Sequence, residues 1–357
     1  MKSALSASWL YWNARTSLAW LLAGLAFAYF AVSNADFLNV GNLYALVQIF
    51  STLALVASGL AIVMIAAEFD LSIAGTFPLA ALVAVKTADS VGIVPALLIA
   101  LVVGSVFGLV NGFLAGVLRI PSLAVTVATM VLSIGIGYAV TDNNLVRMTD
   151  YDASLRLTER VGGVFSIISL VQLGLALLAY AYLKLGWRGR FLYSVGSDGA
   201  RARASGLPVA RTLVFAFVTC AVFASVAGAL QGLSLATGQA GSDDAFLLQC
   251  ATAALVGGVA LTGARGSLVG VLGGALLLAV LTNGLGLAGL QSALVQLVNG
   301  VVLVVVVLVD KPLDRLVNRR LRAELDPSIS TAVTDPGADA DGGSVAAART
   351  TETYGRN

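Results

Sequence analysis

Two acidic residues, Glu68 and Asp70, directly follow a long apolar stretch of the chain. A carboxylate at membrane depth costs at least about 2.5 kcal/mol at the bilayer centre, so it usually has a function or a partner. Asp70 is therefore a candidate gate or pathway residue. Alternatively, Asp70 lies at the membrane interface and caps the next helix with help from Ser72, because Asp is a favoured N-cap residue. Capping is preferred on the sequence alone, and both interpretations stay open.

Uncharged polar residues inside apolar segments form a second candidate set. Amides and hydroxyls can exchange hydrogen bonds with the hydroxyls of a solute such as a sugar. For any single residue, a hydrogen bond between helices, worth about 0.6 kcal/mol on average, is the preferred explanation. The candidate substrate-pathway residues are Asp70, Ser72, Asn111, Thr126, Thr129, Gln231 and Asn283, and Gln296 and Asn299 are further polar positions of this kind.

A basic segment runs from Lys184 to Arg211, with six basic residues and one acid, Asp198. Asp198 is placed to cap a short helix that extends to Ser205. The segment is nearly 30 residues long, which exceeds what a simple connection needs. It is either an ordinary basic loop near lipid headgroups or a docking element for a cytoplasmic partner. The candidate docking residues are Gly196, Asp198, Arg201, Arg203, Ser205 and Gly206.

Several chemistries are excluded by the residues that the chain lacks. It has no His, its two cysteines lie singly in apolar runs, and none of its four lysines follows a glycine. His-based catalysis, His-containing zinc sites and a phosphate-binding P-loop are therefore ruled out. We expect no catalytic residues, no metal and no cofactor, and an intramembrane enzyme is disfavoured. The net charge of +2 is too small to indicate nucleic-acid binding.

The elements that carry these residues are predicted to be membrane-spanning helices. The chain has 357 residues, of which 58% are hydrophobic and 11% charged, and its mean hydropathy is +0.92. A span needs about 20 mostly apolar residues. The sequence predicts an all-α, polytopic membrane protein with about ten spans, the third and eighth short and covered by other protein. The predicted spans are 16–33, 43–66, 72–88, 92–117, 121–141, 164–184, 212–235, 246–262, 267–285 and 288–309.

The distribution of Lys and Arg predicts the orientation. Ten spans place both termini on one side, and that side receives 17 of the 21 basic residues, so we assign it to the cytoplasm of a cell (plasma or inner) membrane. The predicted organisation is a cytoplasmic N-terminus (1–15), a transmembrane domain (16–310) and a cytoplasmic tail (311–357). We expect the tail to be disordered because it is rich in small and polar residues.

An internal repeat is visible at an offset of 195 residues. Ser72 matches Ser267 and Gly75 matches Gly270, and further small and apolar positions follow. Duplicated halves are common in transporters. The predicted topology makes the two copies parallel, whereas one miscounted span would make them inverted.

Four stretches together resemble the permease subunit of bacterial ATP-binding-cassette (ABC) sugar importers of the ribose/xylose type. The four stretches occur in the same order as in the family. Each stretch alone is weak evidence for the resemblance, whereas the four together are specific for it. The stretches are Glu68–Gly75; Asn111–Gly112 with Leu118–Met130; Gly189–Gly196 with Ser205–Leu207; and Gly263–Ser267 with Asn283–Leu285. Three places depart from the family pattern: Ala67, where the family often has Gly, the segment Asp243–Gln249, and the loop from Val140 to Asn143.

The resemblance implies a permease fold of two repeated halves that works as a homodimer. It also implies two cytoplasmic ATPase subunits that bind the ATP, and an extracytoplasmic solute-binding protein. Residues 196–208 would be the coupling region on which the ATPase docks. The expected cargo is a monosaccharide or a similar neutral polar molecule, and the sequence leaves its identity open. The alternative function is a secondary transporter or channel driven by an ion gradient.

Overall fold

The computed structural model describes the backbone of residues 2–325 and the side chains of residues 15–308 other than residue 153. The chain divides into two compact units. One unit comprises Leu10–Asp310, and the other comprises Met1–Trp9 with Lys311–Asn357. The domain boundaries predicted at residues 15/16 and 310/311 stay predictions, and residues 326–357 of the predicted tail lie outside the described residues.

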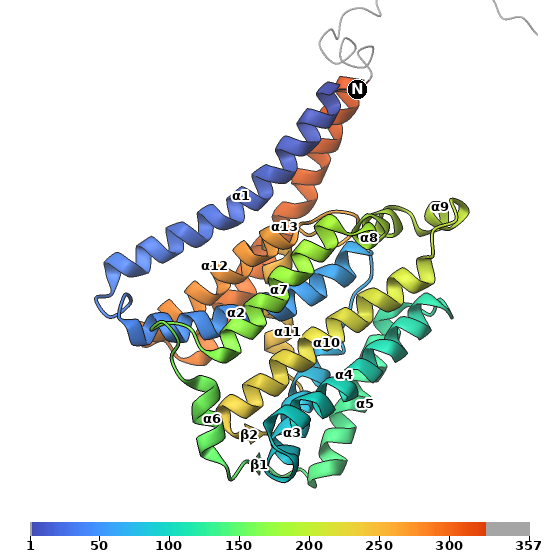
Figure 1. Cartoon of the computed structure of the whole chain (residues 1–357). Helices are drawn as coiled ribbons and strands as arrows, with labels where there is room; N and C mark the ends of the chain where they lie inside the picture. The colour runs from blue at the N-terminus through green and yellow to red at the C-terminus, as the bar shows by residue number, and fades with distance from the viewer. Residues whose placement is uncertain (1, 326–357) are drawn as a thin grey trace, which may run out of the picture. The chain divides into compact units, whose positions relative to one another are not determined.

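The described residues form helices with one small two-stranded ribbon (Figure 1). In the ribbon, Val146 pairs with Gly238 and Arg147 with Thr237 in antiparallel register. The elements in chain order are α1 (Lys2–Ser33), α2 (Val40–Ile65), α3 (Ile73–Val91), α4 (Ile93–Gly116), α5 (Ser122–Thr141), β1 (Val146–Arg147), α6 (Tyr151–Thr158), α7 (Ile167–Leu185), α8 (Trp187–Ser197), α9 (Gly199–Ala204), α10 (Val209–Leu235), β2 (Thr237–Gly238), α11 (Asp244–Val256), α12 (Leu268–Leu287) and α13 (Ser292–Leu325).

The prediction of an all-α polytopic membrane protein is confirmed, and every predicted span contains a helix. Within the described residues, seven helices are long and apolar enough to cross a membrane: α1 from Arg15 onward, α2, α4, α5, α7, α10 and α12. The other three predicted spans correspond to α3, which carries Lys86 and Asp89, to α11 with 13 residues, and to the apolar part of α13, Ser292–Leu308. The sequence therefore predicts ten spans, whereas seven helices among the described residues meet the criteria of length and hydropathy.

Helices α3 and α11 lie against other helices, as predicted, but only α11 is short, because α3 has 19 residues. The N–H of Asp243, which precedes α11, donates to the carbonyl of Ala74 in the first turn of α3 at 2.8 Å. The rings of Phe77 and Phe246 lie 4.6 Å apart, centroid to centroid. Because neighbouring helices cover both, neither needs the continuous apolar surface that lipid would demand.

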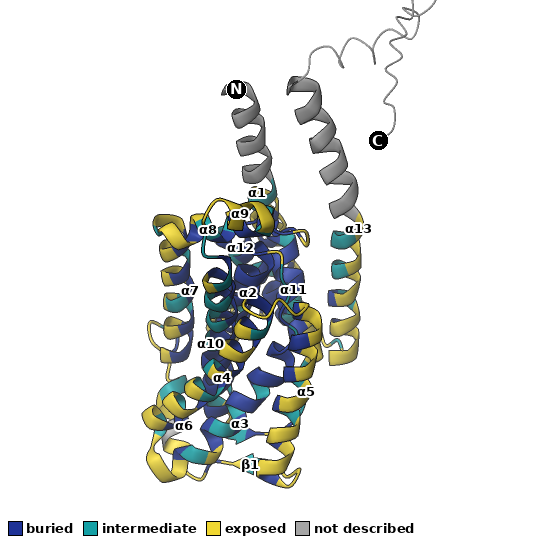
Figure 2. Cartoon of the chain, turned by 90° about the vertical axis from the view of Figure 1, so that its right-hand side faces the viewer, coloured by how far each residue is buried: buried dark blue, intermediate teal, exposed yellow. Residues whose placement is uncertain are grey.

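The centre of the bundle is formed by α2 and α10, which are buried over most of their length (Figure 2). Helix α4 runs beside α10 and presents a glycine to it on every fourth residue. A Cβ on Gly108 would come within 2.8 Å of the Val218 backbone, and one on Gly112 within 2.6 Å of the Val214 backbone. The two backbones therefore pack in direct contact, a geometry that small residues spaced by four permit.

Each of the two repeated segments begins a helix, although Ser267 caps its helix through its side chain and Ser72 does not. Ser72 directly precedes α3 and Ser267 directly precedes α12. The preceding loops touch each other, because the N–H of Ala264 donates to the carbonyl of Ile65 at 2.8 Å. At the opposite end of the bundle, Asn283 of α12 lies beside Asn42 of α2. The two segments thus begin at loops that touch each other, and the parallel arrangement of the copies stays a prediction.

Candidate functional site

Four of the predicted pathway residues form one buried chain of hydrogen bonds. Ser72 donates its hydroxyl to Asp70 Oδ1 at 2.6 Å, and Asn111 Nδ2 donates to Ser72 Oγ at 2.9 Å. Thr129 Oγ1 donates to Asn111 Oδ1 at 2.8 Å. Asp70 and Asn111 are fully buried. The chain links the loop before α3 to α4 and α5.

Asp70 combines parts of its two interpretations. Its Oδ1 accepts the N–H of Ser72 at 2.9 Å as well as the hydroxyl, so it orders the turn that starts α3. The side chain is enclosed by protein, however, and does not lie exposed at an interface. Its Oδ2 is buried without a hydrogen-bond partner among the described residues, and so is the hydroxyl of Thr126, whose carbonyl accepts from Thr129.

The other predicted pathway residues lie elsewhere. Asn283 and Asn42 exchange two amide hydrogen bonds of 2.9 and 3.0 Å, which join α12 to α2. Gln231 is half-buried on α10, and Asn299 Nδ2 of α13 donates to Thr282 Oγ1 of α12 at 3.4 Å. The structure therefore brings together Asp70, Ser72, Asn111, Thr126 and Thr129 but neither Gln231 nor Asn283.

The predicted docking element forms α8 and α9 at one end of the bundle, opposite α6 and the β-ribbon (Figure 1). Asp198 caps α9 as expected, accepting the N–H groups of Ala200 and Arg201 at 3.0 and 2.9 Å. Arg201 Nε also lies 2.8 Å from Asp198 Oδ2. The hydrogen bond from the Arg201 backbone, with the Arg201 charge beside it, lowers the pKa of the Asp198 carboxyl below its usual range.

Helix α8 packs on the junction between the two repeated loops. A Cβ on Gly196 would lie 1.9 Å from the carbonyl oxygen of Ile65 and 2.8 Å from the N of Ala264. The hydroxyl of Tyr193 donates to the carbonyl of Gly266 at 2.8 Å. The docking element thus touches the two loops that precede the repeated segments, at the point where these loops are hydrogen-bonded to each other.

Beside this junction lies a cavity of about 480 Å³ between α8, α9 and the ends of α2 and α4. Charged residues of both signs line it, including Glu68, Arg119 and Arg203. Arg201 is 89% exposed, so the outer face of α9 is free to meet another protein.

Comparison with known proteins gives the family. Residues 42–307 match the family described as branched-chain amino acid transport system / permease component. The chain is 33% identical to a probable ABC transporter permease of Sinorhizobium fredii over 67% of this chain and 72% of the relative. The ribose import permease of Escherichia coli is 30% identical over 69% of this chain and 78% of its own length. The chain belongs to this family of ABC importer permeases.

A more distant relative of the permease is the xylose/arabinose import permease of Sulfolobus acidocaldarius, 28% identical over 70% of this chain and 72% of the relative. No solved structure gives a significant match. The resemblance that the four sequence stretches indicated is thereby confirmed.

The structure explains several motif positions of the permease. Gly196 and Tyr193 hold α8 against the repeat junction, and Ser267 Oγ accepts the N–H of Gly270 at 3.1 Å to cap α12. Ala67, which departs from the family pattern, has a φ of +63°. That region suits glycine, the residue that the resemblance leads us to expect there.

A polar cavity of the permease between α11 and α13 was not predicted from the sequence. Its volume is about 230 Å³, and Gln249, Thr252, Gln296 and Asn299 line it. Asn299 is 5% exposed, and its Oδ1 has no hydrogen-bond partner in the described structure. Gln249 belongs to the segment that departs from the family pattern. A polar residue recurring every three or four positions on α11 and α13 was the available signal.

Proposed function

We propose that this permease moves a monosaccharide or a similar neutral polar solute across the membrane, driven by separate ATPase subunits. The observation that carries the proposal is the position of α8 and α9, which present an exposed basic surface and contact the junction of both repeats. A partner that moves this element acts on both halves at once. Two relatives support the cargo, since they are import permeases for ribose and for xylose/arabinose.

The proposed orientation places α8 and α9 in the cytoplasm. Arg188, Arg190, Arg201 and Arg203 lie on these helices, whereas Arg147 and Arg156 lie in β1 and α6 at the other end. The excess of basic residues on the α8 side supports a cytoplasmic position. The ATPase subunits dock there, and a solute-binding protein delivers its cargo at the end formed by α6 and the β-ribbon.

The proposed solute route runs along the cavity between α11 and α13 and is completed by a second copy of the chain. The amide and hydroxyl groups there suit a neutral solute, because they donate and accept hydrogen bonds without imposing a charge. In this proposal Asp70, Ser72, Asn111 and Thr129 hold α3, α4 and α5 together, since their hydrogen bonds are made to one another.

Uptake by proteoliposomes tests the proposal. Vesicles that contain the permease, its ATPase subunits and the binding protein are expected to accumulate radiolabelled pentose only when ATP is supplied to the ATPase side. Ser205→Arg places a bulky cation on the proposed docking surface and is expected to abolish both uptake and co-purification of the ATPase. Ser90 is an exposed serine near the other end of the bundle, so Ser90→Arg is the matched control and is expected to leave co-purification of the ATPase unchanged.

The result also separates the proposal from the alternative. Accumulation driven by an ion gradient without any ATPase would identify a secondary transporter and refute the proposal. Normal uptake by a well-inserted Ser205→Arg variant would refute the docking surface while leaving ATP-driven import intact.

A further inference from the structure

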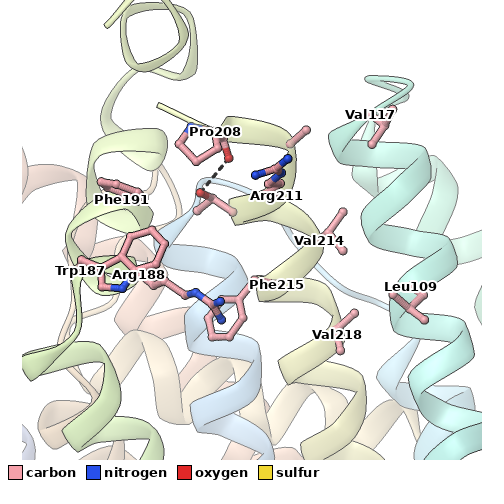
Figure 3. A pocket seen from close by; sticks show the side chains of 12 residues that line it. Leu109, Val117, Trp187, Arg188, Phe191, Pro208, Arg211, Val214, Phe215 and Val218 are labelled. Atoms are coloured by element: carbon pink, nitrogen blue, oxygen red, sulfur yellow. Dashed lines mark hydrogen bonds between the residues drawn. The ribbon is translucent and has the colours of Figure 1, made fainter. Parts of the chain in front are cut away.

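A groove opens between α4, α8 and α10 at the end of the bundle that carries α8 (Figure 3). Its volume is about 520 Å³. Apolar and aromatic side chains make most of its wall: Leu109, Val117, Trp187, Phe191, Phe215 and Val218. None of the candidate solute-pathway or docking residues lines it.

The groove has the dimensions and surface of a site for an acyl chain. It follows α10 from Arg211 to Val218, which is about 10 Å along a helix. Leu109 is 51% exposed and Trp187 is 55% exposed. On a helix bundle that spans the membrane, such a surface is expected to meet hydrocarbon.

Two arginines stand at the same groove. The guanidinium carbon of Arg188 lies 5.3 Å from the ring centroid of Phe215 and 5.5 Å from that of Trp187. Figure 3 shows the Arg188 side chain extending to Phe215, with Arg211 across the groove on α10. In the described part of the chain neither arginine forms an ion pair with a carboxylate, whereas nearby Arg201 is paired with Asp198. Two positive charges thus border an apolar groove without compensation.

We propose that this groove binds an anionic phospholipid. Its phosphate lies between Arg188 and Arg211, and one acyl chain follows Leu109, Phe215 and Val218. Basic pockets between membrane helices bind anionic headgroups by the same combination of charge and hydrocarbon. A second copy of the chain fits less well, because a two-fold interface at this groove would bring the same arginines and no opposite charge.

The bound lipid would stabilise the docking element. Arg188 and Trp187 lie in the first turn of α8, and the last turn of the same helix contacts the repeat junction through Gly196. A headgroup on Arg188 therefore holds the helix that the ATPase is proposed to move, and lipid composition would affect transport through α8.

Native mass spectrometry of the purified full-length permease, titrated with phosphatidylglycerol or phosphatidylcholine, tests the proposal. We expect tighter retention of phosphatidylglycerol. Arg188→Gln and Arg211→Gln are expected to weaken it about fivefold each, and the double variant about 30-fold. Arg190→Gln removes the same charge from α8 outside the groove and is expected to leave retention unchanged. Leu109→Trp fills the groove and leaves both arginines in place. It is expected to reduce retention of phosphatidylglycerol by excluding the acyl chain.

Three outcomes would overturn the proposal. The first is equal retention of phosphatidylglycerol by the wild type and the folded double variant. The second is that inorganic phosphate displaces the bound lipid as effectively as phosphatidylglycerol does at the same concentration. That result would indicate a phosphate site that does not bind an acyl chain. The third is dissociation of a dimer in the double variant, which would assign the groove to a second copy. Thermal unfolding of each variant verifies that it is folded.

Discussion

At the scale of single residues, the interior polar groups of the permease act mainly on one another. The side-chain amide of Asn111 donates a hydrogen bond to Ser72 through its N–H and accepts one from Thr129 through its oxygen. One side chain therefore joins two different segments to α4. A buried polar group is costly unless it is hydrogen-bonded. An amide that satisfies two hydroxyls at once therefore fixes the relative positions of the helices that carry them.

Backbone strain at Ala67 gives a prediction at this scale. Its φ of +63° is unfavourable for any residue with a Cβ, whereas the neighbouring Ala66 has a φ of −76°. Ala67→Gly is expected to raise the free energy of unfolding by about 1 kcal/mol, because the left-handed conformation costs about that much. Ala66→Gly is the control and is expected to lower it by about 0.5–1 kcal/mol. Thermal unfolding in detergent compares the two, and shifts of the same sign would contradict the assignment.

At the scale of elements, the close contact between α4 and α10 depends on the absence of side chains. Gly104, Gly108, Gly112 and Gly116 are spaced by four and lie on one face of α4. A Cβ on any of them would come closer than 3 Å to an atom of α10 or the residues beside it. Lipid-embedded helices gain little from hydrophobic burial, so packing at such short range is a main source of their association.

The glycines of α4 and α5 should therefore respond oppositely to the same substitution. A Cβ on Gly108 would lie 2.7 Å from Ala221 Cβ, whereas one on Gly135 of α5 would meet nothing within 4 Å. Gly108→Ala is expected to destabilise the permease by about 1–3 kcal/mol through overpacking. Gly135→Ala is expected to be neutral or stabilising by up to about 1 kcal/mol, because alanine favours the helix. Unfolding in detergent measures both, and equal effects would exclude a tight α4–α10 contact.

At the scale of the whole molecule, the proposed mechanism connects the two ends of the transmembrane bundle. The repeated loops meet at the hydrogen bond between Ile65 and Ala264, and α8 packs on that point. From there α12 runs to the end of the bundle where Asn283 meets Asn42 of α2. A displacement of α8 would therefore act on both of these loops at once, as the proposed coupling to the ATPase requires.

Cross-linking tests the proposed position of the second copy. Both native cysteines, Cys220 and Cys250, are buried, so the wild type is expected to give no cross-link. Gln296→Cys, at the α11–α13 cavity, is expected to link two copies through a membrane-permeant bis-maleimide. Leu178→Cys lies on α7 with 67% exposure and serves as the control. Stronger linking through residue 178 than through residue 296 would move the interface to α7.

Much of the fold followed from hydropathy because a lipid-spanning segment must be apolar over about 20 residues. The prediction of a short helix was right for α11, which has 13 residues, and wrong for α3, which has 19 residues, as many as α7. Hydropathy gave no indication of α6 or of the pairing between β1 and β2, since two-residue strands have no periodicity to detect. The Asp198 cap was predictable because capping depends on residues two and three positions away.

The sequence by itself determined the membrane class, the approximate helices, the local cap of α9 and the family, because each depends on composition or on residues near one another in the chain. Only the tertiary structure decided that Asn111 joins Asp70 and Ser72 to Thr129, and that Gln249 and Asn299 share a cavity. It also decided that Gly196 lies against Ile65. These relations join residues far apart in the chain, and helices covered by uniform apolar side chains carry no sequence signal for which faces meet.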